Sequence, residues 1–342
     1  MKASIIRTVV ILLVVTGSCS NDQDKQIYLG FSFPEEIYHA PCSVKFINYT
    51  QYATQFLWDF GDQTTSADFE PVHWYAEAGD YTVTLTASNT TYSKSESKQV
   101  RILSAVPRIT APPAQLKLDP FYKKYVDAGG IPIISSAKVP DEALLAVLTM
   151  ANAMLKKRPD VRQKMISNKA RVGIMSKDEV TTDMPEHAFL ANDPNTDWDK
   201  RARGLGGTVA VPLTSCAEEN VLCYTDDPYR NEDIFVHEFA HAIHLMGILF
   251  VDNQFNTRLK STFDKARAAG KWDRTYAGTH PEEYWAEGVQ SWFNCAAQAS
   301  PPNGVYNHVN TRAELREYDR DLYDLLQEWL PDDTTPISCH RN

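Results

Sequence analysis

The chain has 342 residues, of which 43% are hydrophobic, so it holds enough apolar material for packed cores and is long enough for two domains. Its formal net charge of −10 at pH 7 argues against the basic face that nucleic-acid binding requires, and we expect no nucleic-acid partner. Beyond the N-terminus, no apolar run approaches the ~20 residues that a membrane-spanning helix needs.

Residues 1–18 are predicted to be a signal peptide. Basic residues precede an apolar run over 9–15, and small residues precede Cys19, which is typical of an exported chain. The segment resembles a bacterial lipobox, although Thr16 stands where such motifs usually carry leucine. The resemblance implies that Cys19 is lipidated, that residues 19–27 form a polar tether, and that the protein lies at the bacterial cell envelope or surface with the lipid as its one membrane attachment. An ordinary secretory signal is the alternative.

The other five cysteines can form disulfides if the chain is exported. Cys216 and Cys223 lie close together across a predicted loop, so we expect a local bridge between them. Cys295 and Cys339 are then expected to fasten the C-terminal tail, which leaves Cys42 as a thiol. Sequence does not decide such pairings, and other connectivities stay open.

Residues 28–104 are predicted to be all-β. Short runs of alternating apolar and polar residues, such as 43–46 and 81–86, are separated by polar turns. This period of two indicates strands with one buried face, and the turn spacing is typical of a small sandwich.

One combination of motifs within this region is specific. The segment 58–62 is WDFGD, and it is followed by HWY at 73–75 and GDY at 79–81. The combination resembles a polycystic kidney disease (PKD) repeat over nearly its full length. The resemblance implies an immunoglobulin-like β-sandwich with Trp58 and Tyr81 in the core between the sheets. We expect a spacer that holds an enzyme off the surface; glycan binding is the alternative.

Residues 105–119 contain three prolines and are predicted to be a semi-rigid linker. Residues 120–342 mix strands with long helices, which indicates a single α+β domain. The elements expected in this domain are a helix over 140–158, strands over 171–175 and 204–211, and helices over 231–246, 254–269, 281–298 and 311–330.

The predicted helix over 231–246 contains the sequence HEFAH. His237 and His241 are four residues apart, so both imidazoles lie on one helix face and can bind one zinc ion. Glu238 stands beside them, where it can take a proton from a water molecule activated by the metal. We therefore expect one catalytic Zn²⁺ with Glu238 as general base.

A catalytic zinc ion needs a third protein ligand, and the best candidates lie downstream. Glu283 and Glu287 are four residues apart on a predicted helix. The spacing resembles that of glutamate-ligated zinc peptidases such as thermolysin. The resemblance implies that Glu283 binds zinc and that Glu287 accepts a hydrogen bond from the far nitrogen of a ligand histidine. The reverse assignment of the two acids stays open.

The segment 275–287 also resembles the corresponding part of the anthrax lethal factor catalytic domain, where a tyrosine, the glutamate ligand and a second acid have the same spacings after an HEFGH helix. The resemblance implies a zincin-like fold with Tyr276 as hydrogen-bond donor to the developing oxyanion. Ala240 replaces the family's glycine, and the toxin's substrate does not carry over. An ordinary core or surface tyrosine is the alternative for Tyr276.

Other residues are weaker candidates. His244 and His280 lie near the predicted ligands, but packing or surface roles are expected for them. The segment 204–211 is either an edge strand that pairs with a peptide substrate or a plain core strand. Arg201 and Arg203 are candidates to contact a substrate carboxylate, with solvated surface charge as the favoured interpretation.

These features predict an exported, monomeric zinc metallopeptidase that acts on a peptide or protein substrate. One alternative is a non-catalytic surface lipoprotein that binds through its β-sandwich. Another is a hydrolase specialised for glycoproteins or cell-wall peptides, in which the sandwich recruits glycan. The complete set of His237, Glu238, His241 and Glu283 favours an enzyme. Cleavage specificity, including endopeptidase against exopeptidase action, stays open.

Overall fold

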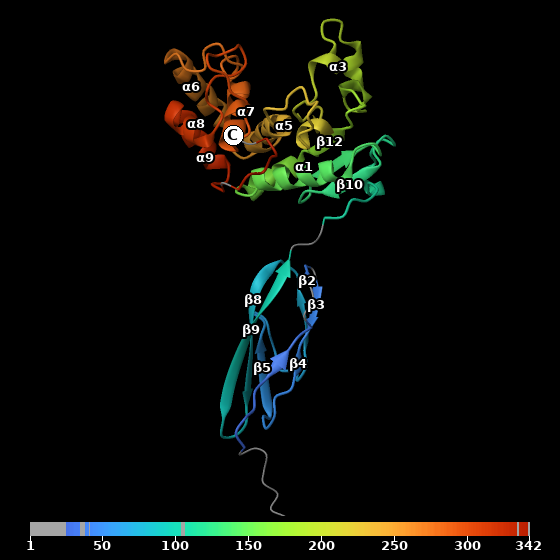
Figure 1. Cartoon of the computed structure of the whole chain (residues 1–342), viewed down its shortest axis with the longest axis vertical. Helices are drawn as coiled ribbons and strands as arrows, with labels where there is room; N and C mark the ends of the chain where they lie inside the picture. Colours follow the sequence, from blue (N-terminus) through green and yellow to red (C-terminus); the bar gives the residue numbers. More distant parts are fainter. Residues whose placement is uncertain (1–24, 35–37, 41, 104–106, 334, 341–342) are drawn as a thin grey trace, which may run out of the picture. The chain divides into compact units, whose positions relative to one another are not determined.

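The computed structural model describes residues 25–34, 38–40, 42–103, 107–333 and 335–340. The chain divides between residues 106 and 107 into two compact units, each with its own hydrophobic core (Figure 1). The predicted signal peptide and Cys19 lie outside the described residues, so lipidation stays a prediction. Within the described ranges, no helix combines the length and apolarity that crossing a membrane requires.

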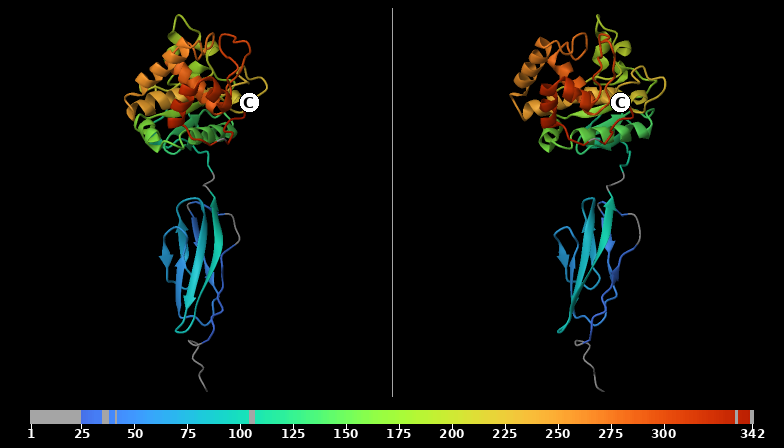
Figure 2. Two further views of the ribbon diagram at one scale, coloured as in Figure 1. Left: turned by 90° about the vertical axis from the view of Figure 1, so that its left-hand side faces the viewer. Right: turned by 60° about the vertical axis from the view of Figure 1, so that its left-hand side comes forward.

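The first unit consists of β-strands, as predicted. The strands are β1 (Phe31–Ser32), β2 (Tyr38–His39), β3 (Cys42–Lys45), β4 (Ile47–Asn48), β5 (Gln55–Asp59), β6 (Thr65–Ser66), β7 (Val72–Tyr75), β8 (Gly79–Ser88) and β9 (Ser93–Leu103). The largest sheet has the order β2-β9-β8-β5-β6, and β3 pairs with β7. Figure 2 shows the long strands of this unit lying side by side. The long β8–β9 hairpin is antiparallel throughout. The result is a small β-sandwich.

The core of the sandwich forms around Trp58 on β5. Its side chain is completely buried, its Nε1 donates to the Asp68 carbonyl at 2.9 Å, and its ring meets Phe31 edge to face at 5.0 Å. Tyr81, expected in the same core, packs at its margin and is partly buried. At the predicted turn, Gly61 has φ +81°, and a Cβ there would lie 2.8 Å from the Thr82 carbonyl oxygen, so only glycine fits without strain.

The second unit contains a four-stranded sheet of order β10-β11-β12-β13 with helices around it (Figure 1). Its strands are β10 (Lys124–Asp127), β11 (Pro132–Ser135), β12 (Arg171–Met175) and β13 (Leu213–Ala217). β10 pairs antiparallel with β11, and β11, β12 and β13 are parallel. The parallel strands are almost wholly buried, which explains their continuous rather than alternating apolar pattern.

The α-helices are α1 (Asp141–Met154), α2 (Pro159–Ser167), α3 (Trp198–Arg201), α4 (Glu218–Val221), α5 (Ile234–Ala242), α6 (Phe255–Ala268), α7 (Pro281–Trp292), α8 (Arg312–Tyr318) and α9 (Arg320–Trp329). A π-helical turn, Ile243–Gly247, continues α5. Short 3-10 helices lie at Ala114–Leu116, Thr181–Asp183, Ala188–Asn192 and Ile248–Phe250.

One predicted helix ends early and another is divided in two. The helix expected over 140–158 ends at Met154, and α2 begins at Pro159, where proline is suited to the first helical position. The helix expected over 311–330 is split into α8 and α9 at Asp319, whose side chain accepts from the Leu322 amide and caps α9. The break at Asp319 is therefore marked by a capping side chain, and the start of α2 by a proline.

The predicted strand 204–211 and the predicted linker 105–119 differ from the structure. In the predicted strand 204–211, only Leu205 pairs, through an isolated antiparallel bridge to Ser215 beside β13. In the predicted linker 105–119, the described part belongs to the second unit, because Thr110 and Tyr125 exchange backbone hydrogen bonds of 3.0 and 2.8 Å. The last residues of the predicted tether also touch the first unit, since Lys94 Nζ donates to the Ile27 carbonyl at 2.8 Å.

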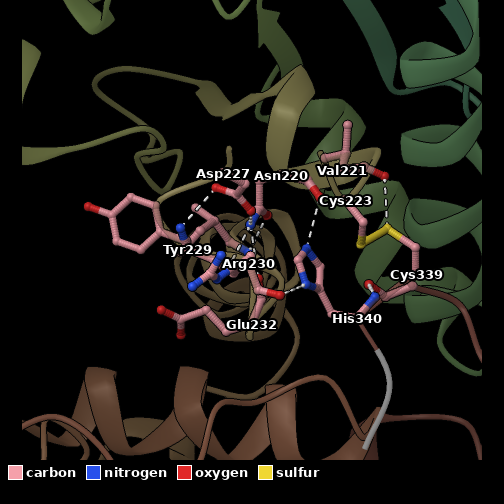
Figure 3. The surroundings of a disulfide bond; sticks show 11 residues. Asn220, Val221, Cys223, Asp227, Tyr229, Arg230, Glu232, Cys339 and His340 are labelled. Carbon is pink, nitrogen blue, oxygen red and sulfur yellow. Dashed lines mark hydrogen bonds between the residues drawn. A yellow bond between two sulfur atoms is a disulfide. The ribbon is translucent and has the colours of Figure 1, made fainter. Parts of the chain in front are cut away.

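The predicted disulfide pairing is also wrong. The structure joins Cys223 to Cys339, whereas Cys216 and Cys295 are free and fully buried (Figure 3). Cys216 lies inside β13 and packs into the main core, so it cannot reach the loop that carries Cys223. The C-terminal tail, rather than the adjacent strand, comes close to this loop.

Candidate metal centre

Helix α5 has one face in the core and one face toward a cavity. Asp233 caps its N-terminus, with the carboxylate accepting from the Val236 amide at 2.9 Å. The side chains that anchor the inner face are Phe235, Val236, Phe239 and Ala240, all buried. The helical period then leaves His237 and His241 one turn apart on the other side.

Helix α7 lies against α5 and supplies the acids. The Trp285 indole donates to the Ala240 carbonyl at 2.9 Å, which locks the two helices together. This contact brings Glu283 to the two histidines: its Oε2 lies 3.1 Å from His237 Nε2 and 3.4 Å from His241 Nε2. The two Nε2 atoms are 3.2 Å apart. Glu283, and not Glu287, thus completes the group of three.

The spacing of these three atoms suits zinc. Around a tetrahedral zinc ion with ligands at about 2.0–2.1 Å, neighbouring ligand atoms are roughly 3.3–3.5 Å apart. The three observed separations of 3.1, 3.2 and 3.4 Å match the edges of one such face. Two imidazoles and a carboxylate are a donor set that zinc accepts, and they leave a fourth position free for chemistry.

The far nitrogen of His237 has a partner that the sequence did not predict. Its Nδ1 lies 3.1 Å from Gln290 Oε1, whereas Glu287 Oε1 is 3.6 Å away, beyond hydrogen-bond distance. Gln290 follows Glu283 by seven residues and Glu287 by three, so it shares their helix face. Extending the face by one turn would have identified it.

The charges around the histidines shift several pKa values. Burial alone would lower the pKa of His237, but the hydrogen bond to Glu283 and the charges of Glu238 and Glu287 raise it to about 10. Burial would raise the pKa of Glu283, but the hydrogen bonds with His237 and His241 lower it far below its usual value. Burial raises the pKa of Glu287 to about 8. The acids around His237 therefore favour its protonated form when no metal ion is bound.

A cavity of about 510 Å³ opens onto these residues. Glu238 and Tyr276 both line it and are partly buried. The Tyr276 hydroxyl donates to Glu283 Oε1 at 3.1 Å, and burial together with the Glu283 charge raises its pKa to about 12. Tyr276 is thus a neutral hydrogen-bond donor beside the metal position over the ordinary pH range.

A glycine-containing segment forms another wall of the cavity. Leu205 and Ser215 exchange backbone hydrogen bonds of 3.3 and 2.9 Å, which holds the segment antiparallel to β13. In such a pairing the neighbouring residues, Gly204 and Gly206, direct their backbone groups to the opposite side. A Cβ at Gly206 would lie 2.7 Å from His241 Cβ, so glycine permits this close approach to α5.

We expect Gly206→Ala to lower the free energy of unfolding by roughly 1–3 kcal/mol and to weaken metal binding, because the new methyl group forces the segment or α5 to shift. Chemical denaturation and a metal titration of the full chain measure the two effects. Val209→Ala, at an exposed position of the same loop, is the matched control and should change stability by less than about 0.5 kcal/mol. Equal behaviour of the two variants would contradict the close-packing interpretation.

The weaker candidates lie outside the group of three. His244 is fully buried and its Nε2 bonds to Asn256 Oδ1 at 2.6 Å, while His280 is exposed just before α7. Arg203 pairs with Glu219 at 2.7 Å and also donates to backbone carbonyls, so its role is structural rather than that of a solvated charge. Arg201 is exposed at the rim of the cavity.

Comparison with known proteins identifies the first unit. The family model of the PKD domain matches residues 38–103, so this part of the chain is a PKD domain, as the WDFGD motif predicted. No curated protein matches the chain.

Solved structures similar to this chain include two bacterial PKD domains and a structure of carbohydrate-binding modules. The PKD1 domain of the Vibrio cholerae metalloprotease PrtV is 28% identical, with 22% of this chain and 94% of that chain covered and a TM-score of 0.20. The PKD1 domain of Vibrio anguillarum Epp is 22% identical, covering 24% and 98%, with a TM-score of 0.21. Carbohydrate-binding modules from the β-sandwich superfamily are 20% identical, covering 25% and 39%, with a TM-score of 0.23.

Proposed function

We propose that the second unit is a zincin-like, zinc-dependent metallopeptidase. The observation that carries this proposal is the group formed by His237 Nε2, His241 Nε2 and Glu283 Oε2, whose separations of 3.1–3.4 Å suit one zinc ion. Glu238 lines the same cavity and is not part of this group, so its carboxylate can act as a general base.

His237, His241 and Glu283 would hold the ion. When bound, zinc polarises a carbonyl group and makes water acidic enough to attack it near neutral pH. Glu238 takes the proton of the attacking water and returns it to the leaving amine. Tyr276 would turn its hydroxyl proton, which lies toward Glu283 Oε1 in this structure, to the oxyanion that develops on the substrate carbonyl, and its raised pKa keeps that proton on the hydroxyl oxygen.

A peptide substrate is favoured by the wall at Gly204 and Gly206. Their backbone groups face the cavity side of the segment, where an extended peptide can pair with them as an added strand. Side chains at these two positions would collide with α5 rather than with the peptide, so glycine lets the segment lie against the helix. The predicted strand 204–211 is reduced to one bridged residue, Leu205, and the proposal places the substrate backbone along this edge.

We also propose that the protein is exported and anchored through Cys19, with the PKD domain as a spacer. The Cys223–Cys339 disulfide supports export, because such bonds persist in oxidising compartments. Glycan binding by the PKD domain stays a prediction, as does the monomeric state.

The proposal is tested by metal analysis and peptide cleavage on the purified full chain. We expect one zinc ion per chain, cleavage of a mixed peptide library, complete loss of cleavage with a chelator, and recovery when zinc is returned. His241→Ala should lower zinc affinity by several orders of magnitude, because it removes one of three protein ligands. A protein without tightly bound zinc and without cleavage would instead support a non-catalytic binding lipoprotein.

A further inference from the structure

The side-chain amide of Gln290 lies fully buried between the metal-binding group and the N-terminus of α5. Its Oε1 is 3.1 Å from His237 Nδ1. Its Nε2 is 3.0 Å from the Asp233 carbonyl oxygen and 3.4 Å from Glu232 Oε2. All polar atoms of this side chain therefore have partners inside the protein.

These partners determine which way the amide faces. A backbone carbonyl oxygen can only accept a hydrogen bond, so the group beside the Asp233 carbonyl has to be the NH₂ donor. The amide oxygen is then left facing His237. The opposite orientation would bring two carbonyl oxygens within 3.0 Å of one another and would leave the NH₂ group facing the imidazole.

The orientation of the amide in turn determines the tautomer of His237. An amide oxygen only accepts, so Nδ1 of His237 has to carry a proton to form this bond. The lone pair of the neutral ring is then on Nε2, the atom that lies 3.1 Å from Glu283 Oε2 and 3.2 Å from His241 Nε2. An amide also cannot take the Nδ1 proton away, as a carboxylate such as Glu287 can.

A second layer of contacts holds Gln290 in place. Glu232, one of the two acceptors of the amide, receives a hydrogen bond from the Tyr306 hydroxyl, and Tyr306 lines the cavity. Asp233, which supplies the other acceptor, caps α5. The NH₂ group of the amide thus has two acceptors that are themselves held in place. One is the carbonyl of Asp233, the residue that caps α5, and the other is the buried acid Glu232, which accepts a hydrogen bond from Tyr306.

We propose that Gln290 is a positioning residue that holds His237 in the Nδ1-protonated tautomer and fixes its ring plane, so that Nε2 faces the metal position. This inference rests on the proposed zinc site and extends it. The sequence resemblance implied that Glu287 accepts the hydrogen bond from the far nitrogen of a ligand histidine. Its carboxylate is 3.6 Å from His237 Nδ1 and is not the direct partner.

The test compares Gln290→Met, which keeps the size of the side chain but removes the hydrogen bonds, with Gln290→Glu, which keeps an oxygen that can accept from Nδ1. Zinc affinity of the full chain is measured by competition with a chromophoric chelator. Gln290→Met is expected to bind zinc roughly 10–100-fold more weakly. Gln290→Glu is expected to recover only part of that loss, because its second oxygen faces the Asp233 carbonyl and Glu232, to which the NH₂ group of the wild-type amide donates. Thermal unfolding of the metal-free variants separates this effect from a general loss of stability.

A second readout does not depend on a variant that folds. In the zinc-loaded wild-type chain with ¹⁵N-labelled histidine, long-range ¹H–¹⁵N spectra are expected to show His237 with a protonated Nδ1 and a metal-shifted Nε2. A zinc-loaded chain in which Nδ1 lacks the proton, or a folded Gln290→Met protein with wild-type zinc affinity, would overturn the inference and leave the zinc site intact. A wild-type chain that binds no zinc would overturn the proposed function as well.

Discussion

Replacing Glu238 by glutamine is expected to slow peptide hydrolysis by about 10²–10⁴-fold while zinc stays bound. The carboxylate lines the cavity but is not one of the three grouped donor atoms, so the metal ligands are unchanged. Glutamine has the same shape and cannot take a proton from water. The loss should therefore appear in kcat, with zinc content near one ion per chain.

The matched control is Glu282→Gln, which removes an acid from an exposed position of α7, one residue before Glu283. It should leave both kcat and zinc content unchanged. Steady-state kinetics on a cleaved library peptide and metal analysis of the same preparations give the comparison. A Glu238→Gln protein that keeps zinc and hydrolyses peptide at the wild-type rate would exclude Glu238 as the general base.

Removing the Cys223–Cys339 disulfide is expected to lower the free energy of unfolding of the second unit by roughly 4–5 kcal/mol. The bond closes a loop of 116 residues, and loop-closure entropy in the unfolded chain predicts a value of this size. Such a loss is a large fraction of the stability of an ordinary domain. Chemical denaturation of a Cys223→Ser, Cys339→Ser double variant measures it.

The disulfide also fastens the tail to the loop that leads into α5 (Figure 3). The His340 ring nitrogens lie 2.8 Å from the Asn220 carbonyl and 2.9 Å from the Arg230 carbonyl, and the Asn220 side chain accepts from the Ile234 amide in the first turn of α5. The double variant should therefore also bind zinc more weakly than the wild type.

Cys42→Ser is the control for this variant, because Cys42 lies on β3 of the first unit and takes no part in the Cys223–Cys339 bridge. It should leave the unfolding of the second unit unchanged. If the double variant unfolds at the same denaturant concentration as this control, the bridge contributes nothing to stability and the tail is held by its hydrogen bonds alone.

Features that depend on neighbouring residues could be predicted from the sequence. The alternating runs and the WDFGD turn within residues 28–104 indicated a PKD domain, and the family comparison confirms one over residues 38–103. His237 and His241 share a helix face because the α-helical period brings residues four apart together. These patterns involve residues close in sequence, so they can be recognised without knowledge of the fold.

Contacts between distant segments could not be predicted in this way. The resemblance to zinc peptidases implied that Glu283 binds the metal but left the reverse assignment open. In the structure Glu283 rather than Glu287 lies beside both histidines, because the Trp285 indole holds α7 against α5. The Cys223–Cys339 pair likewise depends on where the C-terminal tail returns, 116 residues away.

Gln290 shows most clearly what helical spacing determines and what tertiary packing determines. Its place on the face of Glu283 and Glu287 follows from helical spacing. Its contact with His237 exists only because the Asp233 carbonyl and Glu232, on another element, turn its amide oxygen toward the ring. Helical periodicity therefore brings the chemical groups to one side of their helices, and the packing of α5 against α7 decides which of those groups touch.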